Sequence, residues 1–194
     1  MKLPTVFFFL LMLAGLAHCQ SPSDIASLDA SGKAVLARFQ NLPPSCQVHP
    51  APDGEPGTPL IIGGTLLRKE NQAPIPNASV LVYHTDSKGD YRQSVEGKPE
   101  TARISGTVQT DEAGRFLIST ILPGQYNDKG PGGHIHLQVE GASPRGYTFQ
   151  FAQYSSVTDK QFISDNDQFF LVELQRDKKG RLVGFLEVAV KEYR

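Results

Sequence analysis

From Leu60 to the end, the chain is a series of short apolar stretches separated by turn residues. Most of these stretches alternate apolar and polar side chains, which is typical of strands with one buried face. Short strands at this spacing favour a β-sandwich. We therefore predict an all-β fold, an antiparallel β-sandwich of about eight strands with prealbumin-like topology. The expected strands are 60–68, 79–84, 104–110, 115–120, 134–140, 147–153, 169–175 and 182–190.

Two turns in this series are specific predictions. Asp111-Glu112-Ala113-Gly114 lies between two of the expected strands and predicts a hairpin. Asp177-Lys178-Lys179-Gly180 joins the last two strands. A third turn, Asp86-Ser87-Lys88-Gly89-Asp90, leads directly to Tyr91.

The first 59 residues have a different character. An apolar run at 6–16 follows Lys2, and Ala17-His18-Cys19 resembles a cleavage site, so we predict a signal peptide at 1–19. We expect a short helix at 23–40 and then a proline-rich arm at 41–59 without regular structure, because prolines remove backbone donors. The predicted division is therefore signal peptide 1–19, helix and arm 20–59, and β-sandwich domain 60–194.

The predicted leader and the charge limit the partners and the location. The apolar run is too short to span a bilayer, so we expect a secreted or periplasmic protein. Lipid anchoring at Cys19 is the disfavoured alternative, because His18 stands where a small residue is needed. The chain carries 19 basic and 20 acidic residues, a formal net charge of −1. This balance gives no reason to expect nucleic acid or an anionic membrane as a partner.

The strand that begins at His134 carries the first candidate site residues. Alternate residues of a strand point to one face, so His134 and His136 project side by side while Ile135 points to the opposite face. Two neighbouring imidazoles can ligate one metal ion. The alternative is that His134 and His136 are surface residues without a function. His84 and His49 are interpreted as solvated or structural residues.

Two tyrosines are placed at turns, where rigid strands can support ligands. Tyr91 follows the turn that begins at Asp86, and Tyr126 follows Leu122-Pro123-Gly124-Gln125. Phenolate and imidazole together suit a hard ferric ion. A phenol ionises at neutral pH only beside a strong cation, which such an ion would supply.

These residues lie within a longer pattern. Its parts are Gly64, Pro74-Ile75-Pro76-Asn77-Ala78, Gly89-Asp90-Tyr91, Thr110-Asp111, Gly114-Arg115-Phe116, the run from Ile121 to Tyr126, and His134-Ile135-His136. In this order they resemble the intradiol ring-cleavage dioxygenases, which use non-haem ferric iron. The resemblance implies that Tyr91, Tyr126, His134 and His136 are the Fe(III) ligands.

The resemblance also implies an activity. A secreted enzyme of this kind would cleave catecholic rings between their hydroxyls with O₂, giving muconate-type diacids. Tyr126 would leave the metal and accept a substrate proton, and Gln150, or as second choice Gln153, would help position the substrate. Oligomeric state stays open.

The sequence departs from the family pattern at Pro131, where classical members carry an arginine. Lys129, Arg103 or Arg145 are the candidates to replace it. The alternative to an enzyme is a non-catalytic, prealbumin-like secreted binding module, because residues 64–126 also resemble such domains. Those domains have no need for Tyr91 together with His134 and His136.

Overall fold

The computed structural model describes residues 25–125, 132–155 and 157–194, and the side chains of 157–159 are not described. Several features named in the sequence analysis therefore lie outside the described residues: the predicted signal peptide 1–19, Cys19, Tyr126, Lys129 and Pro131.

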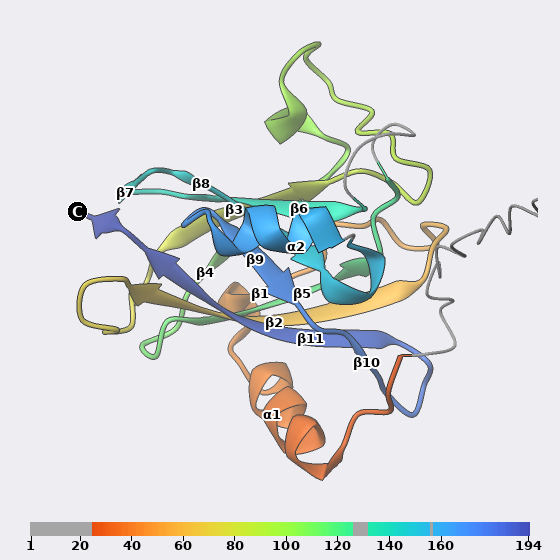
Figure 1. Ribbon diagram of the computed structural model, residues 1–194, viewed down its shortest axis with the longest axis horizontal. Helices are drawn as coiled ribbons and strands as arrows, with labels where there is room; N and C mark the ends of the chain where they lie inside the picture. The colour runs from red at the N-terminus through yellow and green to blue at the C-terminus, as the bar shows by residue number, and fades with distance from the viewer. Residues whose placement is uncertain (1–24, 126–131, 156) are drawn as a thin grey trace, which may run out of the picture.

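Two five-stranded sheets make up the fold (Figure 1). The first has the order β1 (Gln47–Val48), β5 (Arg115–Ile121), β2 (Pro59–Arg68), β11 (Leu182–Val190), β10 (Gln175–Arg176). The second has the order β4 (Ile104–Gln109), β3 (Ser79–His84), β6 (His134–Val139), β8 (Gly146–Phe151), β9 (Phe169–Val172).

The predicted all-β sandwich is confirmed. Of twelve strands in the described residues, the eight with four residues or more correspond to the expected series. The other four have two residues each; β7 (Ala142–Ser143) and β12 (Glu192–Tyr193) form a separate pair. The purely antiparallel arrangement was wrong, because β1–β5, β2–β11 and β8–β9 pair in parallel. The β8–β9 pair is possible because the chain crosses over between them through η4 (Ala152–Tyr154) and α2 (Val157–Ser164).

The core lies between the two sheets. Alternate residues of each strand point inward, as in β6, where Ile135, Leu137 and Val139 are at most 1% exposed. They pack in one cluster with residues of the first sheet such as Ile62 and Phe116. Burying side chains of this size contributes about 1.5–3 kcal/mol each. The opposite face of β6 is therefore free to carry polar groups.

The N-terminal helix covers the outer face of the first sheet (Figure 1). Helix α1 (Ala30–Gln40) buries Leu36 and Phe39 against a second cluster that includes Ile61 and Val183. The predicted start at residue 23 was wrong. Asp29 caps the helix by accepting a bond from Gly32 N at 2.7 Å, and the preceding Leu28 instead donates its N–H to Arg176 O.

The proline-rich arm contains regular structure, contrary to the prediction. A short 3-10 helix, η2 (Pro44–Cys46), begins at a proline, a position where the missing N–H is not needed. Strand β1 follows and pairs with β5, and Val48 is buried. Pro44 is the first residue of η2, and β1 contains no proline.

The predicted hairpin at Asp111–Gly114 was also wrong. The turn forms, but β4 before it belongs to the second sheet and β5 after it to the first. Gly114, at φ +73°, accepts a bond through its carbonyl from Leu66 N of β2 at 2.7 Å, which directs the chain to the first sheet. The corresponding inward residues, Val108 and Phe116, lie in the same core.

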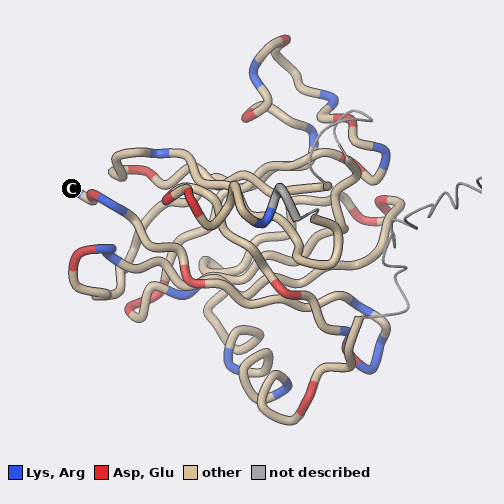
Figure 2. The backbone as a smooth tube through the Cα atoms, viewed as in Figure 1, with Lys and Arg blue, Asp and Glu red and all other residues tan. Residues whose placement is uncertain are grey.

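The face of the second sheet that points away from the first sheet is covered in part by a long loop. Residues 85–103, with the 3-10 helix η3 (Pro99–Thr101), rise from the end of β3 above this face (Figure 1). Acidic and basic residues alternate along the loop (Figure 2). Among the described helices, none has the length and hydropathy that crossing a bilayer requires.

Candidate functional site

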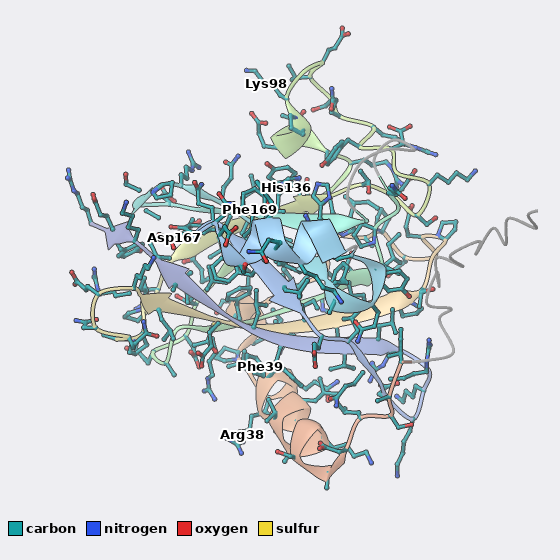
Figure 3. The ribbon with its side chains drawn as sticks, in the orientation of Figure 1. Arg38, Phe39, Lys98, His136, Asp167 and Phe169 are labelled. Atoms are coloured by element: carbon teal, nitrogen blue, oxygen red, sulfur yellow. The ribbon has the colours of Figure 1, made fainter. Side chains whose placement is uncertain are left out.

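The two histidines of β6 lie on the outer face of the second sheet. Their ring centroids are 4.7 Å apart and their planes are nearly perpendicular, at 87°. Both side chains are half-buried, while Ile135 between them points into the core. The alternation predicted from the sequence therefore brings the two imidazoles together on one face (Figure 3 labels His136).

Three contacts fix the ring of His136. Its Nδ1 lies 3.0 Å from the hydroxyl of Thr148, its register partner on β8. Its Nε2 lies 2.9 Å from the hydroxyl of Tyr91. Tyr83, its register partner on β3, stacks on the ring with centroids 4.8 Å apart. If Nδ1–H donates to Thr148, Nε2 carries the lone pair and accepts from Tyr91.

Tyr91 reaches this place from the loop above the sheet. It follows the turn at residues 86–90 and is 45 positions from His136 in the chain. An open cavity lies beside it, lined by Asp90, Tyr91, Arg92, Gln93, Ser94 and Glu96. The loop thus brings one phenol to the pair of imidazoles.

His134 is the first residue of β6. Its Nδ1 lies 3.3 Å from Gly132 O, and its register partner is Gln150 on β8. Gln150 is only 3% exposed, and its Oε1 accepts a bond from the hydroxyl of Ser155 at 3.4 Å. The amide of Gln150 therefore stands beside the histidine pair and has few other partners among the described residues.

Both histidines are neutral at neutral pH. Burial lowers the pKa of His136 to about 4, and the charges that His134 and His84 would carry lower it further. Burial also lowers the pKa of His134, against the opposing effect of the Gly132 carbonyl. Neutral imidazole is the form that binds a metal ion.

The segment that leads to Tyr126 is held close to both other parts of the site. Gly124 N donates to Asp86 O at 2.8 Å, and Gly124 O accepts from the hydroxyl of Thr85 at 2.9 Å. A side chain at Gly133, just before His134, would meet Pro123 O at 1.9 Å. The chain up to Gln125 therefore lies between the Tyr91 loop and the start of β6, and Tyr126 itself falls outside the described residues.

The structure shows other partners for three residues that the sequence analysis named as alternatives, Arg103, Arg145 and Gln153. Arg103 is committed to Glu55, with two bonds of 2.8 and 2.7 Å. Arg145 lies at the far end of β6, where its carbonyl accepts from Val139 N. Gln153 bonds to both backbone groups of Leu174, at 3.0 Å each, so it supports the backbone.

Sequence reasoning missed three residues that shape this site. Tyr83 and Thr148 contact His136 from the neighbouring strands, and Asp86 holds the turn before Tyr91. The register that pairs β3 and β8 with β6 could not be read from the sequence. For Asp86 there was a signal, since the pattern Asp-x-x-Gly occurs at each of the three turns singled out above.

The described donor set fits a metal that accepts phenolate and imidazole. It consists of one phenol and two imidazoles, one of which already shares a hydrogen bond with the phenol. Within the described ranges, no group of three or more His, Cys, Asp or Glu side chains comes together. Any metal held here would therefore need the tyrosine oxygen as well as the two imidazoles.

Comparison with known proteins places these features in context. Residues 44–190 match a family model described as dioxygenase. A catechol 1,2-dioxygenase from Acinetobacter baylyi (strain ATCC 33305 / BD413 / ADP1) is 34% identical over 71 residues. That match covers 36% of this chain and only 22% of the relative, about a fifth of its length.

Solved structures share the fold at low identity. The dioxygenase domain of a dioxygenase carbohydrate-binding protein fusion from Streptomyces sp. SirexAA-E superposes with TM-score 0.57 at 20% identity, covering 77% of this chain and 92% of that one. An intradiol ring-cleavage dioxygenase from Tetranychus urticae gives 0.52 at 18%, covering 74% and 85%. Catechol 1,2-dioxygenase from Acinetobacter sp. ADP1 gives 0.53 at 18%, covering 76% and 57%.

Proposed function

Because the chain belongs to the intradiol dioxygenase family, we propose that it cleaves catecholic rings with O₂ between the two hydroxyls, giving muconate-type diacids. The proposed metal is Fe(III), held by Tyr91, Tyr126, His134 and His136. One observation carries the proposal: the hydroxyl of Tyr91 lies 2.9 Å from Nε2 of His136, with His134 beside it. The prealbumin-like binding module gives no reason for this convergence of residues from a loop and a strand.

The chemistry of the donors supports iron. Imidazole nitrogen and phenolate oxygen are ligands that suit a ferric ion, and the two imidazoles are neutral. Bound there, Fe(III) would act as a Lewis acid that binds and activates the catechol for reaction with O₂. Tyr126 enters the proposal from the family resemblance alone.

The chain's own residues would prepare the site. In the tautomer in which Nδ1–H of His136 donates a hydrogen bond to Thr148 Oγ1, the lone pair of Nε2 is directed at Tyr91. Tyr91, whose hydroxyl lies 2.9 Å from Nε2, would bind Fe(III) through its oxygen and would lose its phenolic proton in doing so. Gln150, buried beside His134, offers an amide that can donate to or accept from a bound substrate.

The test is iron loading followed by turnover. Purified protein reconstituted with ferric iron should show a visible tyrosinate-to-iron absorption band and should consume O₂ with catechol, forming a ring-opened diacid detectable by mass spectrometry. Tyr91→Phe should shift or bleach the band, and His134→Ala should lose most of the iron. His49→Ala, at an exposed position outside the site, is the matched control and should change neither.

Two results would reject the proposal in different ways. Protein that takes up no iron and stays colourless would favour the non-catalytic module. Full ferric occupancy without O₂ uptake on catechol, 4-methylcatechol, protocatechuate and hydroxyquinol would leave an iron- or catechol-binding protein on the family scaffold.

Export stays a prediction alongside this proposal, and it rests on the apolar run at 6–16. The mature chain should begin at or near Gln20. Mass spectrometry of secreted material checks this, and a diacylated Cys19 would support the lipoprotein alternative.

A further inference from the structure

Three turns of the structure share one geometry. They begin at Asp86, Asp111 and Asp177 and have the pattern Asp-x-x-Gly. In each, Oδ1 of the aspartate accepts the N–H groups two and four residues later, and the backbone N–H of the aspartate donates to the carbonyl four residues later. The glycines have φ of +86°, +73° and +77°. The carboxylate is thus the centre around which each turn is built.

The turn at Asp86 differs in what binds the second carboxylate oxygen. In the other two turns the residue four positions later is an arginine, and its own side chain closes the turn: Arg115 Nε lies 2.9 Å from Asp111 Oδ2, and Arg181 Nε lies 2.7 Å from Asp177 Oδ2.

At Asp86 that position is Asp90, and the arginine is moved two residues on. Arg92 Nε lies 3.1 Å from Asp86 Oδ2, while Asp90 N lies 3.2 Å from Oδ1. Tyr91 therefore lies in the chain between Asp90 and Arg92, both of which bond to the carboxylate of Asp86.

Arg92 also has a backbone conformation that needs support. Its φ is +44°, in the left-handed region, which is strained for a residue other than glycine. Its N–H donates to Asp90 Oδ1 at 2.9 Å, and its side chain is paired with Asp86. These two bonds hold the chain immediately after Tyr91.

The backbone carbonyl of Asp86 also holds a second segment, residues 121–125. It accepts from Gly89 N at 3.1 Å within the turn and from Gly124 N at 2.8 Å outside it. A side chain at Gly124 would meet Gly89 N at 2.5 Å and Ser87 O at 2.6 Å, so the contact needs a glycine. The turn and the segment 121–125 are therefore fixed to each other.

We propose that Asp86 is a positioning residue: its buried carboxylate, 4% of the residue being exposed, sets where the Tyr91 hydroxyl stands relative to His136. The proposal rests on the proposed function, in which that hydroxyl is an iron ligand. The bonds of Asp86 described above go to the turn, to Arg92 and to Gly124. Asp86 acts by holding the residues on both sides of Tyr91 and by fixing the neighbouring Gly124.

The experiment compares Asp86→Asn with Asp177→Asn in the full chain. Asp177 makes the same turn contacts at the β10–β11 hairpin, away from the site, so it controls for loss of a carboxylate-centred turn. The first readout uses metal-free protein: the imidazole ¹⁵N shifts of His136, which report the bond between Nε2 and Tyr91. The second is ferric affinity, titrated by the tyrosinate-to-iron band.

We expect Asp86→Asn to move the His136 Nε2 shift toward that of Tyr91→Phe and to weaken ferric binding about 10- to 100-fold, as is typical when a group that orients a ligand is removed. Asp177→Asn should change neither readout, although its thermal stability falls. Arg92→Ala keeps the carboxylate and should change both readouts in the same direction; it serves as the second variant if Asp86→Asn does not fold.

The proposal is overturned if Asp86→Asn, or Arg92→Ala in its place, leaves the His136 shifts and the ferric affinity at wild-type values while stability falls as in Asp177→Asn. Asp86 would then be structural only. Failure of the proposed function is distinguishable, because a wild-type protein that binds no iron leaves the metal-free shift comparison intact.

Discussion

The ring of Tyr83 lies flat on the imidazole of His136, with centroids 4.8 Å apart and planes inclined by only 18°. The two residues are register partners on β3 and β6. Tyr83 is 7% exposed, and burial raises the pKa of its phenol, against the opposing effect of the side chain of Gln138, which follows His136 on the same face of β6. The orientation of a candidate ligand is therefore fixed by the neighbouring strand as well as by its own.

Two substitutions at Tyr83 should distinguish the effect of its ring, which stacks on His136, from the effect of its hydroxyl. Tyr83→Phe keeps the ring and removes only the hydroxyl, so it should change the free energy of unfolding by about 1 kcal/mol at most. Tyr83→Ala removes the ring and should cost about 3–5 kcal/mol, as for other buried aromatic residues. Urea unfolding of the metal-free protein measures both. Ferric affinity should fall in Tyr83→Ala and stay near wild type in Tyr83→Phe; equal affinities in the two variants would show that the stack does not orient His136.

A methyl group at Gly133 should disturb the site directly. The added Cβ would meet Pro123 O at 1.9 Å, and that oxygen is backbone and cannot rotate away. Gly133→Ala should therefore shift the start of β6 with His134, destabilise the fold by about 1–3 kcal/mol and lower iron occupancy.

Gly146→Ala, on β8, is the matched control because nothing lies within 4 Å of the added atom. Its unfolding midpoint and iron content should equal or exceed those of wild type. If both alanine variants behave alike, the close approach of Pro123 to Gly133 has no role in placing His134.

Much of the fold follows from local patterns that the sequence contains. Period-two alternation predicted β3 and β11 at their observed limits, and it placed His134 and His136 on one face. Which sheet a strand joins is decided by distant partners. The turn at Asp111 has every local sign of a hairpin, yet the contact of Gly114 with Leu66 directs β5 to the other sheet.

The candidate site also has one part that follows from the local sequence and one part that depends on contacts between distant segments. The side-by-side histidines could be derived from residues two apart, whereas the approach of Tyr91 depends on a loop packed through Asp86 and Gly124, nearly forty positions apart. Asp29 shows the same limit at small scale: the apolar stripe suggested a helix from residue 23, and the capping bond to Gly32 starts it at Ala30. Contacts between distant segments are not visible in composition or period.

Stability should depend on pH through His84. This residue is fully buried, with Nε2 2.8 Å from Thr120 Oγ1 on the opposite sheet and Nδ1 2.7 Å from Thr85 O. Burial lowers its pKa from 6.5 to about 4, against the raising effect of the Thr85 carbonyl. Between these values the unfolded chain binds more protons than the folded one, so stability is complete above about pH 6.5 and is lost as the pH falls toward 4.

The loss attributable to His84 should reach about 3 kcal/mol. The measurement is the free energy of unfolding of metal-free protein at pH values from 7.5 to about 4, for wild type and His84→Gln. The variant should be less stable at pH 7.5 and should show a shallower fall. His136 also titrates low and contributes to both curves, so the difference between them reports His84. Parallel curves would contradict the assignment.

The two glutamines after β6 should prove to have different roles. Gln153 makes two 3.0 Å bonds to the backbone of Leu174, which is 1% exposed. Gln153→Ala leaves both backbone groups without partners and should cost about 1–3 kcal/mol for each, with turnover per bound iron unchanged. Gln150 stands beside His134, and within the described residues its side chain makes a single 3.4 Å hydrogen-bond contact, with Ser155.

Gln150→Ala should therefore reduce kcat on catechol by about 10²-fold, the usual effect of removing one donor directed at the reacting atoms, with little change in iron content. Steady-state O₂ uptake normalised to iron, together with urea unfolding, separates the two variants. The same loss of kcat in Gln153→Ala, or unchanged kcat in Gln150→Ala, would reverse the assignment. The difference between the residues lies in their partners: a side chain already bonded to a backbone donor and acceptor cannot turn toward a substrate without releasing both.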